Sequence, residues 1–273
     1  MWYTAGGTSG GPFVMRATVS AALVPVQSPA TPVLPIAAPG TWDRFVETPS
    51  VARDDTDRHV WMTYLGYADT GYVAPAIGLM RSTDTLGVDW VRPAAPIYRP
   101  PPGGWDAALV TGPNLVRAPG GQWRIYYAGA GTTVGIGLLT SPDGVTWTPY
   151  ANAPVFERRI GQWDEATLEP CVRFAHGRWW LWYAGYREPL SNTTRIGIGL
   201  AVSDDGVHWT RVGTGPVLDH GTTGAWNDLS VVSPDVVQEA DGTLLMAAYG
   251  LRTTDPGVNG GSIAFWRSRP ANP

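Results

Sequence analysis

The stretch Gly161–Phe174, GQWDEATLEPCVRF, decides the fold because it is one of four related copies in the chain. The others begin at Gly40 (GTWDRFVETPSV), Gly103 (GGWDAALVTGPNLV) and Gly224 (GAWNDLSVVSPDVV). Each copy has a Trp followed by Asp or Asn, and then a proline seven or eight residues after the Trp. The copies lie 58 to 63 residues apart. Solenoid repeats are usually shorter and more regular, so this spacing favours propeller blades.

The rest of each unit repeats as well. An aromatic segment comes next (VWMTYLGY, WRIYYAGA, WWLWYAGY, LLMAAYGL), followed by a glycine-containing segment (AIGLMRS, GIGLLTS, GIGLAVS, SIAFWRS). Two units then carry the turn sequences SPDGVTW and SDDGVHW, and the first carries a looser STDTLGVDW. A last short segment contains PIY, PVF or PVL. Asp-Gly between two strand-like runs is a hairpin signal, so each unit is predicted to form a four-stranded antiparallel blade.

Partial copies flank the complete units. Before Trp42, MWYTAGG matches the aromatic segment, FVMRATVS the glycine segment and PVLPIA the last strand. The sequence therefore predicts one all-β domain, a five-bladed β-propeller with incomplete first and last blades. The predicted limits are 1–39 and 224–273 for the partial blades and 40–102, 103–160 and 161–223 for the complete ones. Inner strands are expected near 46–52, 111–117, 168–174 and 231–238.

The first partial blade lacks an inner strand in this pattern. We therefore expect the chain to be an N-terminally shortened form of a longer protein. If the missing strand carried the catalytic base, the chain would be inactive.

Composition excludes several classes of function. Charged residues make up 15% of the 273 residues, against about a quarter in an average protein. The net charge is −4 and the 19 basic residues are all arginines without a run, so a nucleic-acid partner is not expected. No apolar stretch is long enough to span a membrane. The N-terminus has no signal-peptide pattern, although a mature secreted or periplasmic protein would look the same and is favoured over a cytoplasmic one. A monomer is expected.

Metal and nucleophile motifs are missing from the sequence. Cys171 is the only cysteine and lies in an apolar run, which indicates a buried, inert thiol. The four histidines are scattered, and only His220 lies in a loop near the predicted mouth. There is no HExxH, P-loop or GxSxG sequence. No cofactor is therefore expected, although a calcium ion in the central channel stays open.

The repeated motifs resemble those of the five-bladed glycoside hydrolases. The shared features are WD…P at each inner strand, the aromatic Y-x-G segment and A-x-S-x-D-G-x-x-W. That superfamily includes arabinanase- and xylosidase-type enzymes, invertase and levansucrase types, and mannoside phosphorylases. The resemblance implies that acidic residues from three inner strands meet at one mouth of the channel. One would be a base or nucleophile, one a general acid, and one would tune that acid. Glycoside hydrolysis needs such a pair of carboxyl groups.

The resemblance carries over to a set of candidate catalytic residues. Glu169 is the predicted general acid, since the other copies have Thr48, Gly112 and Ser233 at that place. Asp43 and Asp106 are the candidates for base or tuning roles. Their recurrence as Asp164 and Asn227 also fits an architectural role, in which each side chain caps a turn.

Further residues are candidates for substrate binding. Tryptophans after each repeat start could stack on sugar rings, although their recurrence also fits packing, and single carboxylates or a cation could contact hydroxyl or phosphate groups. The full set is Trp42, Trp105, Trp163, Glu47, Asp164, Asp235 and Arg187.

The function predicted from these residues is a glycosidase, an inverting one by analogy with arabinanases, acting on furanosides or plant-type side chains. One departure from the family pattern is VTGPNLV, which has no acid beside its proline. The alternatives are a glycoside phosphorylase with Arg187 or Arg173 in a phosphate pocket, a sialidase, and a non-catalytic propeller that binds carbohydrate or protein. The sialidase ranks low because SPDGVTW is one residue shorter than the Asp box.

Overall fold

The computed structural model describes residues 1–7, 11–20, 22–23, 25–27, 31–191, 193–254 and 261–268. These residues form β-strands, turns and bends, with no helix among them. Two compact units make up the chain: residues 1–133 with 138–152, and residues 134–137 with 153–273. Within the described ranges, no helix has the length and apolar character needed to cross a membrane.

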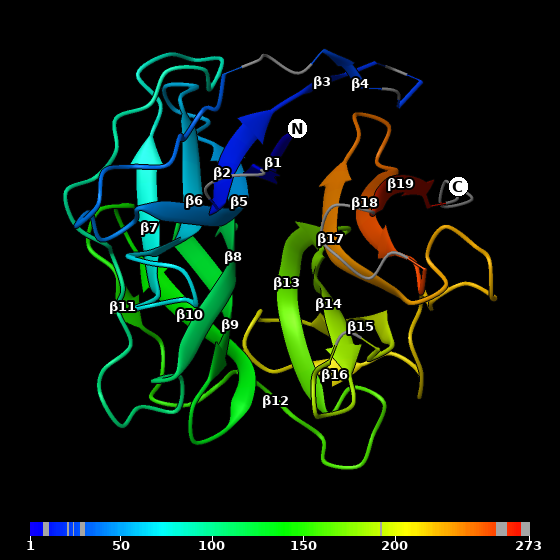
Figure 1. Cartoon of the computed structure of the whole chain (residues 1–273). Coiled ribbons are helices and arrows are strands. Elements are labelled where there is room, and N and C mark those ends of the chain that lie inside the picture. Colours follow the sequence, from blue (N-terminus) through cyan, green and yellow to red (C-terminus); the bar gives the residue numbers. More distant parts are fainter. Residues whose placement is uncertain are drawn as a thin grey trace. The chain divides into compact units, whose positions relative to one another are not determined.

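The first unit contains antiparallel sheets built in chain order (Figure 1). The first pairs are β1 (Trp2–Gly7) with β2 (Gly11–Arg16) and β3 (Thr18–Val19) with β4 (Pro25–Gln27). The next sheet has the order β5 (Phe45–Arg53), β6 (Val60–Tyr67) and β7 (Ala76–Arg81). A further sheet contains β8 (Leu109–Arg117), β9 (Trp123–Ala130), β10 (Val134–Ser141) and β11 (Thr148–Pro149). Residues 134–137 of β10 belong to the second unit, where β12 (Phe156–Glu157) pairs with them.

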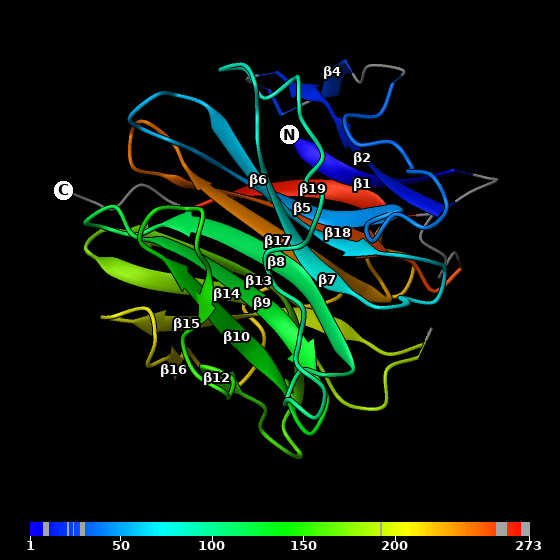
Figure 2. The same cartoon turned by 90° about the vertical axis from the view of Figure 1, so that its left-hand side faces the viewer.

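The second unit repeats this arrangement (Figure 2). One sheet has the order β13 (Ala166–Ala175), β14 (Arg178–Tyr186), β15 (Ile196–Ser203) and β16 (Thr210–Arg211). The other has β17 (Ser230–Gln238), β18 (Leu244–Leu251) and β19 (Ser262–Arg267). The four predicted inner strands are therefore confirmed as β5, β8, β13 and β17.

The last strand predicted for the first four blades is present in each as a short pairing. Leu34, Tyr98 and Leu218 form single bridges to Val14, Ile77 and Ile198, and Phe156 of β12 pairs with Ile136. Each partner lies in the glycine-containing strand. Short outer strands blunt a sheet edge that would otherwise be open to pairing with another chain.

The core lies between successive sheets inside each unit. In the first unit, Met62 and Tyr64 of β6 pack in one cluster, and Leu115 and Ile125 pack with Trp105 in another. In the second unit, Trp182 packs with Val231 and Val236. The aromatic strands β6, β9 and β14 are buried on both faces, which explains why their sequences run as continuous apolar stretches rather than alternating ones.

The Asp-Gly turns explain the SPDG and SDDG repeats. Asp143 Oδ1 accepts the N–H groups of Val145 and Thr146 at 2.8 Å, while Gly144 adopts a φ of +76°. Asp205 accepts the same two bonds from Val207 and His208. The predicted turn between the glycine strand and the short strand that follows is confirmed at both places. The predicted blade limits stay predictions, and 1–39 and 224–273 extend partly outside the described residues.

Candidate active site

Each inner strand carries a β-bulge just before its repeated proline. The register of pairing shifts between Glu47 and Ser50, Thr111 and Asn114, Leu168 and Cys171, and Val232 and Asp235. At each bulge, the residue before proline has a positive φ: +49° at Thr48, +56° at Gly112, +49° at Glu169 and +53° at Ser233. We call these four positions the bulge positions.

The bulge position is a costly place for a residue with a side chain. A residue before proline prefers an extended backbone, and positive φ is uncommon outside glycine. Only the Gly112 copy uses glycine. Bulges re-aim side chains and are frequent near active sites, where backbone strain is also concentrated. Glu169 is the one ionisable residue among the four, so at this copy the bulge carries a carboxyl group.

Glu169 is half-buried and held by the next inner strand. Its Oε2 accepts the backbone N–H of Ser233 at 2.7 Å. Its neighbours Leu168 and Pro170 are half-buried and buried. The carboxyl group therefore has a fixed position inside the second unit.

The repeated Asp residues lie in buried clusters. Asp43, Asp106 and Asp164 are at most 1% exposed. Each accepts a hydrogen bond on Oδ2 from a tyrosine hydroxyl of the adjacent aromatic strand: Tyr64 at 2.8 Å, Tyr127 at 2.9 Å and Tyr183 at 2.8 Å. Burial raises the pKa of all three tyrosines, and the neighbouring carboxylates raise it further. The hydroxyls therefore keep their protons and act as donors.

The Trp of each Trp-Asp pair completes the cluster. Trp42, Trp105 and Trp163 stack on the same three tyrosines at centroid distances of 6.1, 5.9 and 6.1 Å. The Y-x-G glycine lies beneath them: a Cβ on Gly129 would come within 2.6 Å of the Trp105 ring and 2.8 Å of Asp106 Cβ. Thus, the side chains of the Trp-Asp motif pack directly against the tyrosine and glycine of the Y-x-G motif.

The charge on the buried Asp residues is compensated in different ways. Arg92 lies 2.9 Å from Asp43, and Arg159 and Arg211 each lie 2.6 Å from Asp164. Arg92 and Arg211 occupy the same place in their repeats, two residues after the Trp of the turn, and the repeat 103–160 has Pro149 there. Asp106 instead accepts a second tyrosine hydroxyl, from Tyr98 at 2.7 Å. Burial, outweighing the Tyr127 contact, raises the pKa of Tyr98 to about 12.

The copy that begins at Gly224 is consistent with this pairing of the repeated Asp with the tyrosine of the aromatic strand. It has Asn227 in place of the Asp and Ala248 in place of the Tyr, so both partners change together. These contacts match the architectural alternative for Asp43 and Asp106, with tyrosine hydroxyls as donors rather than the backbone groups of a turn. The catalytic hypothesis for the two residues stays a prediction. The three Trp rings likewise have packing contacts, with Trp105 7% exposed and Trp42 and Trp163 half-buried.

Glu47 has a different environment, which the sequence did not reveal. This half-buried carboxylate accepts the Tyr67 hydroxyl on Oε1 at 2.6 Å and the Tyr72 hydroxyl on Oε2 at 3.2 Å. The two tyrosine rings lie 4.8 Å apart between centroids. Tyr67 ends the aromatic strand, and Tyr72 comes from the loop after it. The motif Y-x-G-Y was visible, but which carboxylate its last Tyr contacts depends on how the loop folds.

The other predicted residues of the second unit lie at its surface or are engaged in pairs. Arg187 is exposed and donates to the carbonyl of Gly161 at 2.7 Å. Asp235 is exposed and pairs with Arg173 at 2.9 Å. Arg173 also donates to the Val236 carbonyl at 2.5 Å, so its guanidinium is committed to the strand backbone. His220 contacts Arg195 at 2.9 Å.

Cys171 is buried, as predicted. Its sulfur accepts the N–H of Val236 at 3.2 Å, and burial raises the thiol pKa to about 11. A thiol in this state is a packing group rather than a nucleophile.

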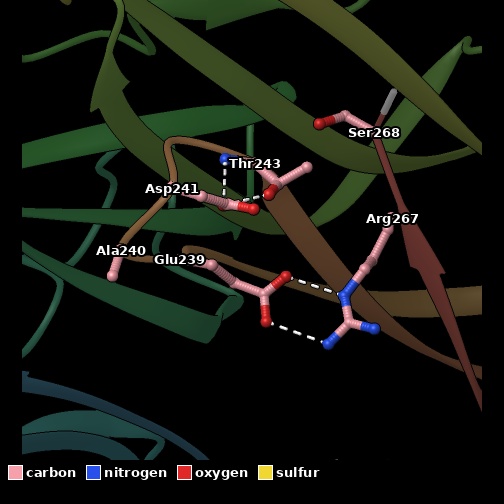
Figure 3. Close-up of a pocket in the computed structure, with 6 residues that line it drawn as sticks. All are labelled: Glu239, Ala240, Asp241, Thr243, Arg267 and Ser268. Atoms are coloured by element: carbon pink, nitrogen blue, oxygen red, sulfur yellow. Dashed lines mark hydrogen bonds and ion pairs between the residues drawn. The ribbon is translucent and has the colours of Figure 1, made fainter. Parts of the chain in front are cut away.

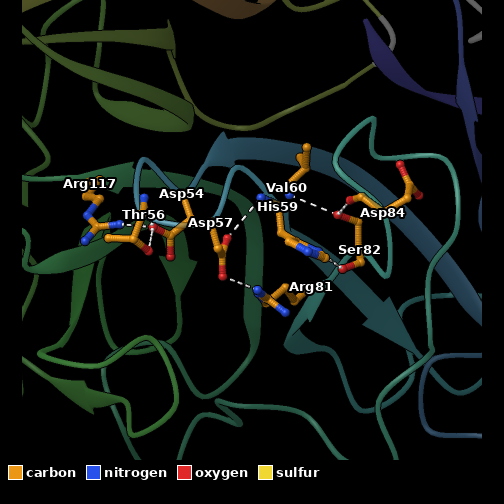
Figure 4. A network of polar contacts seen from close by, with 9 residues as sticks. All are labelled: Asp54, Thr56, Asp57, His59, Val60, Arg81, Ser82, Asp84 and Arg117. Carbon is orange, nitrogen blue, oxygen red and sulfur yellow. Dashed lines mark hydrogen bonds and ion pairs between the residues drawn. The ribbon is translucent and has the colours of Figure 1, made fainter.

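In two other polar regions, the charged side chains form hydrogen bonds and ion pairs with one another. At the β5–β6 hairpin, Asp54 accepts from Thr56 and Arg117, and Asp57 pairs with Arg81 (Figure 4). At the far end of β17, a hollow is lined by residues 239–241, 243, 267 and 268, in which Arg267 forks onto both oxygens of Glu239 at 2.7 and 3.0 Å (Figure 3). Among the described residues, no group of three or more His, Cys, Asp or Glu side chains could hold a metal ion.

No family model matches the chain, and no curated protein matches it. Solved structures do match. The structure of BT0996, an RGII complex, is 17% identical over 98% of this chain and 83% of its own length, with a TM-score of 0.75. A glycosyl hydrolase from Bacteroides ovatus is 18% identical over 99% and 81%, with a TM-score of 0.72. A β-1,2-mannobiose phosphorylase from Listeria innocua is 16% identical over 94% and 67%, with a TM-score of 0.68.

These matches show the fold. The chain has the all-β propeller fold of glycoside hydrolase structures, built from antiparallel blade sheets, as the repeats predict.

Proposed function

We propose that the chain is a glycoside hydrolase that cleaves furanosidic or plant-type side-chain linkages in oligo- or polysaccharides, with Glu169 as its general acid. The observation that carries the proposal is the bulge position of Glu169. It is the one copy of four in which the strained position before proline holds an ionisable side chain. The fold shared with glycoside hydrolases supports the same reaction class.

The Ser233 contact defines how Glu169 would act. The N–H donor on Oε2 fixes the orientation of the carboxyl group. As general acid, Glu169 would carry its proton on Oε1 and keep the Ser233 contact on Oε2. In the proposed step, this proton passes to the glycosidic oxygen as the bond between that oxygen and the anomeric carbon breaks.

Hydrolysis also requires a second carboxylate. In an inverting enzyme this base removes a proton from water while the water oxygen attacks the anomeric carbon from the opposite face of the sugar. The sequence names Asp43 and Asp106 as candidates for this base. Both are buried and accept tyrosine hydroxyls, so activity assays of their Asn variants test the role. Inversion is tested by following the anomer first released by ¹H NMR.

The phosphorylase alternative would need a cation for phosphate. Arg173 is engaged with Asp235 and the backbone, which leaves the exposed Arg187 as the candidate. The mannobiose phosphorylase among the matched structures is the reason to keep this alternative. A non-catalytic propeller that binds carbohydrate is the alternative from a different class.

The experiment is release of reducing sugar from arabinan, xylan and fructan, each with and without inorganic phosphate. We expect hydrolysis of at least one polymer without phosphate, and a loss of about 10²–10⁴-fold in Glu169→Gln. The matched control is Glu239→Gln, which removes a carboxylate from the same unit at the far end of the neighbouring strand and leaves turnover unchanged. Turnover that requires phosphate would establish the phosphorylase. Hydrolysis unaffected by Glu169→Gln would refute the assignment of the acid.

A further inference from the structure

Glu47, Tyr67 and Tyr72 form a small polar-aromatic cluster in the first unit. Tyr67 is 4% exposed, while Tyr72 is 46% exposed. The shorter hydrogen bond to Glu47, 2.6 Å, comes from the buried tyrosine, and the longer one, 3.2 Å, comes from the exposed tyrosine. The buried tyrosine therefore anchors the carboxylate, and the exposed one presents its ring to solvent beside it.

Tyr72 lies in a loop whose backbone conformation is unfavourable and is held by hydrogen bonds. Tyr72 has a φ of +59° and Ala74 a φ of +52°, in a turn closed by the bond from Ala68 N–H to the Val73 carbonyl at 3.0 Å. Arg99 fixes the same turn by donating to the Ala74 carbonyl at 2.6 Å. An aromatic residue with positive φ is a rare conformation, and such conformations persist where the surrounding structure enforces them, often at ligand sites.

The chemistry of the cluster defines the ligand. An exposed aromatic ring next to a carboxylate suits a molecule with an apolar face and hydroxyl donors at its edge, which is the character of a sugar ring. A carboxylate accepts hydrogen bonds but cannot donate them when ionised. It therefore favours neutral hydroxyl donors and repels anionic groups. Of the two cations near the cluster, Arg44 pairs with Asp69, and Arg99 donates to the Ala74 carbonyl.

We infer that Glu47, Tyr67 and Tyr72 form a subsite for a neutral sugar residue, with the Tyr72 ring as platform and Glu47 as hydroxyl acceptor. The inference rests on the proposed function and narrows its substrates to uncharged glycans, excluding uronic acids at this position. Tyr67 is a positioning residue, because it contacts Glu47 rather than the sugar.

Binding is measured in the Glu169→Gln protein by isothermal titration calorimetry. The probes are arabinotriose, xylotriose and the fructan trisaccharide kestose, with trigalacturonic acid as the anionic counterpart. Tyr72→Ala removes the platform, and Tyr72→Phe keeps the ring without the hydroxyl. The matched control is Tyr150→Ala, since Tyr150 is a 52% exposed tyrosine of the same unit.

We expect at least one neutral trisaccharide to bind and the anionic one to bind more weakly. Tyr72→Ala should raise Kd tenfold or more, which corresponds to about 1.4 kcal/mol. Tyr72→Phe should change Kd less than threefold, and Tyr150→Ala not at all. Circular dichroism of each variant checks that it is folded. Equal Kd values for Tyr72→Ala and Tyr150→Ala would overturn the subsite, as would stronger binding of the anionic probe or no binding of any neutral one.

The outcomes separate this inference from the proposed function. Hydrolysis by the wild-type chain that Tyr72→Ala leaves intact in both kcat and KM removes the subsite and keeps the hydrolase. Binding that Tyr72→Ala abolishes, without hydrolysis by the wild type, keeps the subsite and removes the hydrolase. A raised KM at constant kcat in Tyr72→Ala supports both, because it marks lost substrate binding rather than lost chemistry.

Discussion

The backbone N–H of Ser233 donates a 2.7 Å hydrogen bond to Oε2 of Glu169, and both residues occupy the bulge position of their strands. The bulge of β17 therefore orients the side chain that leaves the bulge of β13. This relationship joins architecture to the proposed function, because a backbone distortion present in four copies positions a carboxyl group that occurs in one.

The bulge position of β8 should be less stable with a residue other than glycine. Gly112 has a φ of +56° there, so Gly112→Ala should destabilise the fold by about 1–2 kcal/mol, the cost of left-handed backbone for a residue with Cβ. The control is Gly6→Ala, because Gly6 has no positive φ and an added Cβ would meet nothing within 4 Å. Urea unfolding measures both. Equal stability of the two variants would contradict the strain.

The buried aspartates should differ in their contribution to stability. Asp164→Asn leaves Arg159 and Arg211 without a carboxylate and should cost about 2–4 kcal/mol. Asp106→Asn should cost only about 1 kcal/mol, since the Asn oxygen can still accept from Tyr98 and Tyr127 and no ion pair is lost. Chemical denaturation of the two variants gives the comparison.

The Asp106→Asn variant also tests the hypothesis that Asp106 is catalytic. If the residue is architectural, folded Asp106→Asn should hydrolyse substrate at the wild-type rate. A loss of kcat greater than 100-fold in protein that is fully folded by circular dichroism would instead restore Asp106 to the catalytic set.

Stability should fall in acid as the turn aspartates are protonated. Hydrogen bonds from the Thr146 and Val145 N–H groups lower the pKa of Asp143 to about 2. Since this lies below the ordinary value of 3.8, its contribution is complete above pH 4 and is lost as pH falls towards 2. Asp143→Asn should therefore flatten the decline in unfolding free energy between pH 4 and 2. Asp204→Asn is the control, because this exposed carboxylate lies beside the equivalent turn and pairs with Arg178 rather than with the turn backbone. An identical slope in both variants would contradict the assignment.

The repeats made the fold predictable, but the role of single residues less so. Trp-Asp, Y-x-G and the proline recur with fixed spacing, so strand order and inner strands could be placed from the sequence alone. The pairing of Asp43 with Tyr64, and not with a turn backbone, depends on side-chain geometry across two strands. The contact of Tyr72 with Glu47 depends on a loop with positive φ at a tyrosine, which local sequence preferences argue against. Glu169 was chosen as the candidate acid because it breaks the repeat, and its catalytic role stays a prediction.

If Glu169 is the general acid, the loss of activity in Glu169→Gln should depend on the leaving group of the substrate. A natural sugar leaving group must be protonated as the bond breaks, whereas 2,4-dinitrophenolate leaves as a stable anion and needs no proton. Glu169→Gln should therefore lose about 10²–10⁴-fold in kcat on the polysaccharide that the wild type hydrolyses, but less than tenfold on the 2,4-dinitrophenyl glycoside of the same sugar. If Asp43 is the base, Asp43→Asn should lose activity on both substrates alike, because a base acts on water whatever the leaving group. Equal losses of Glu169→Gln on the two substrates would show that Glu169 acts as base or nucleophile, or holds the substrate, rather than donating the proton.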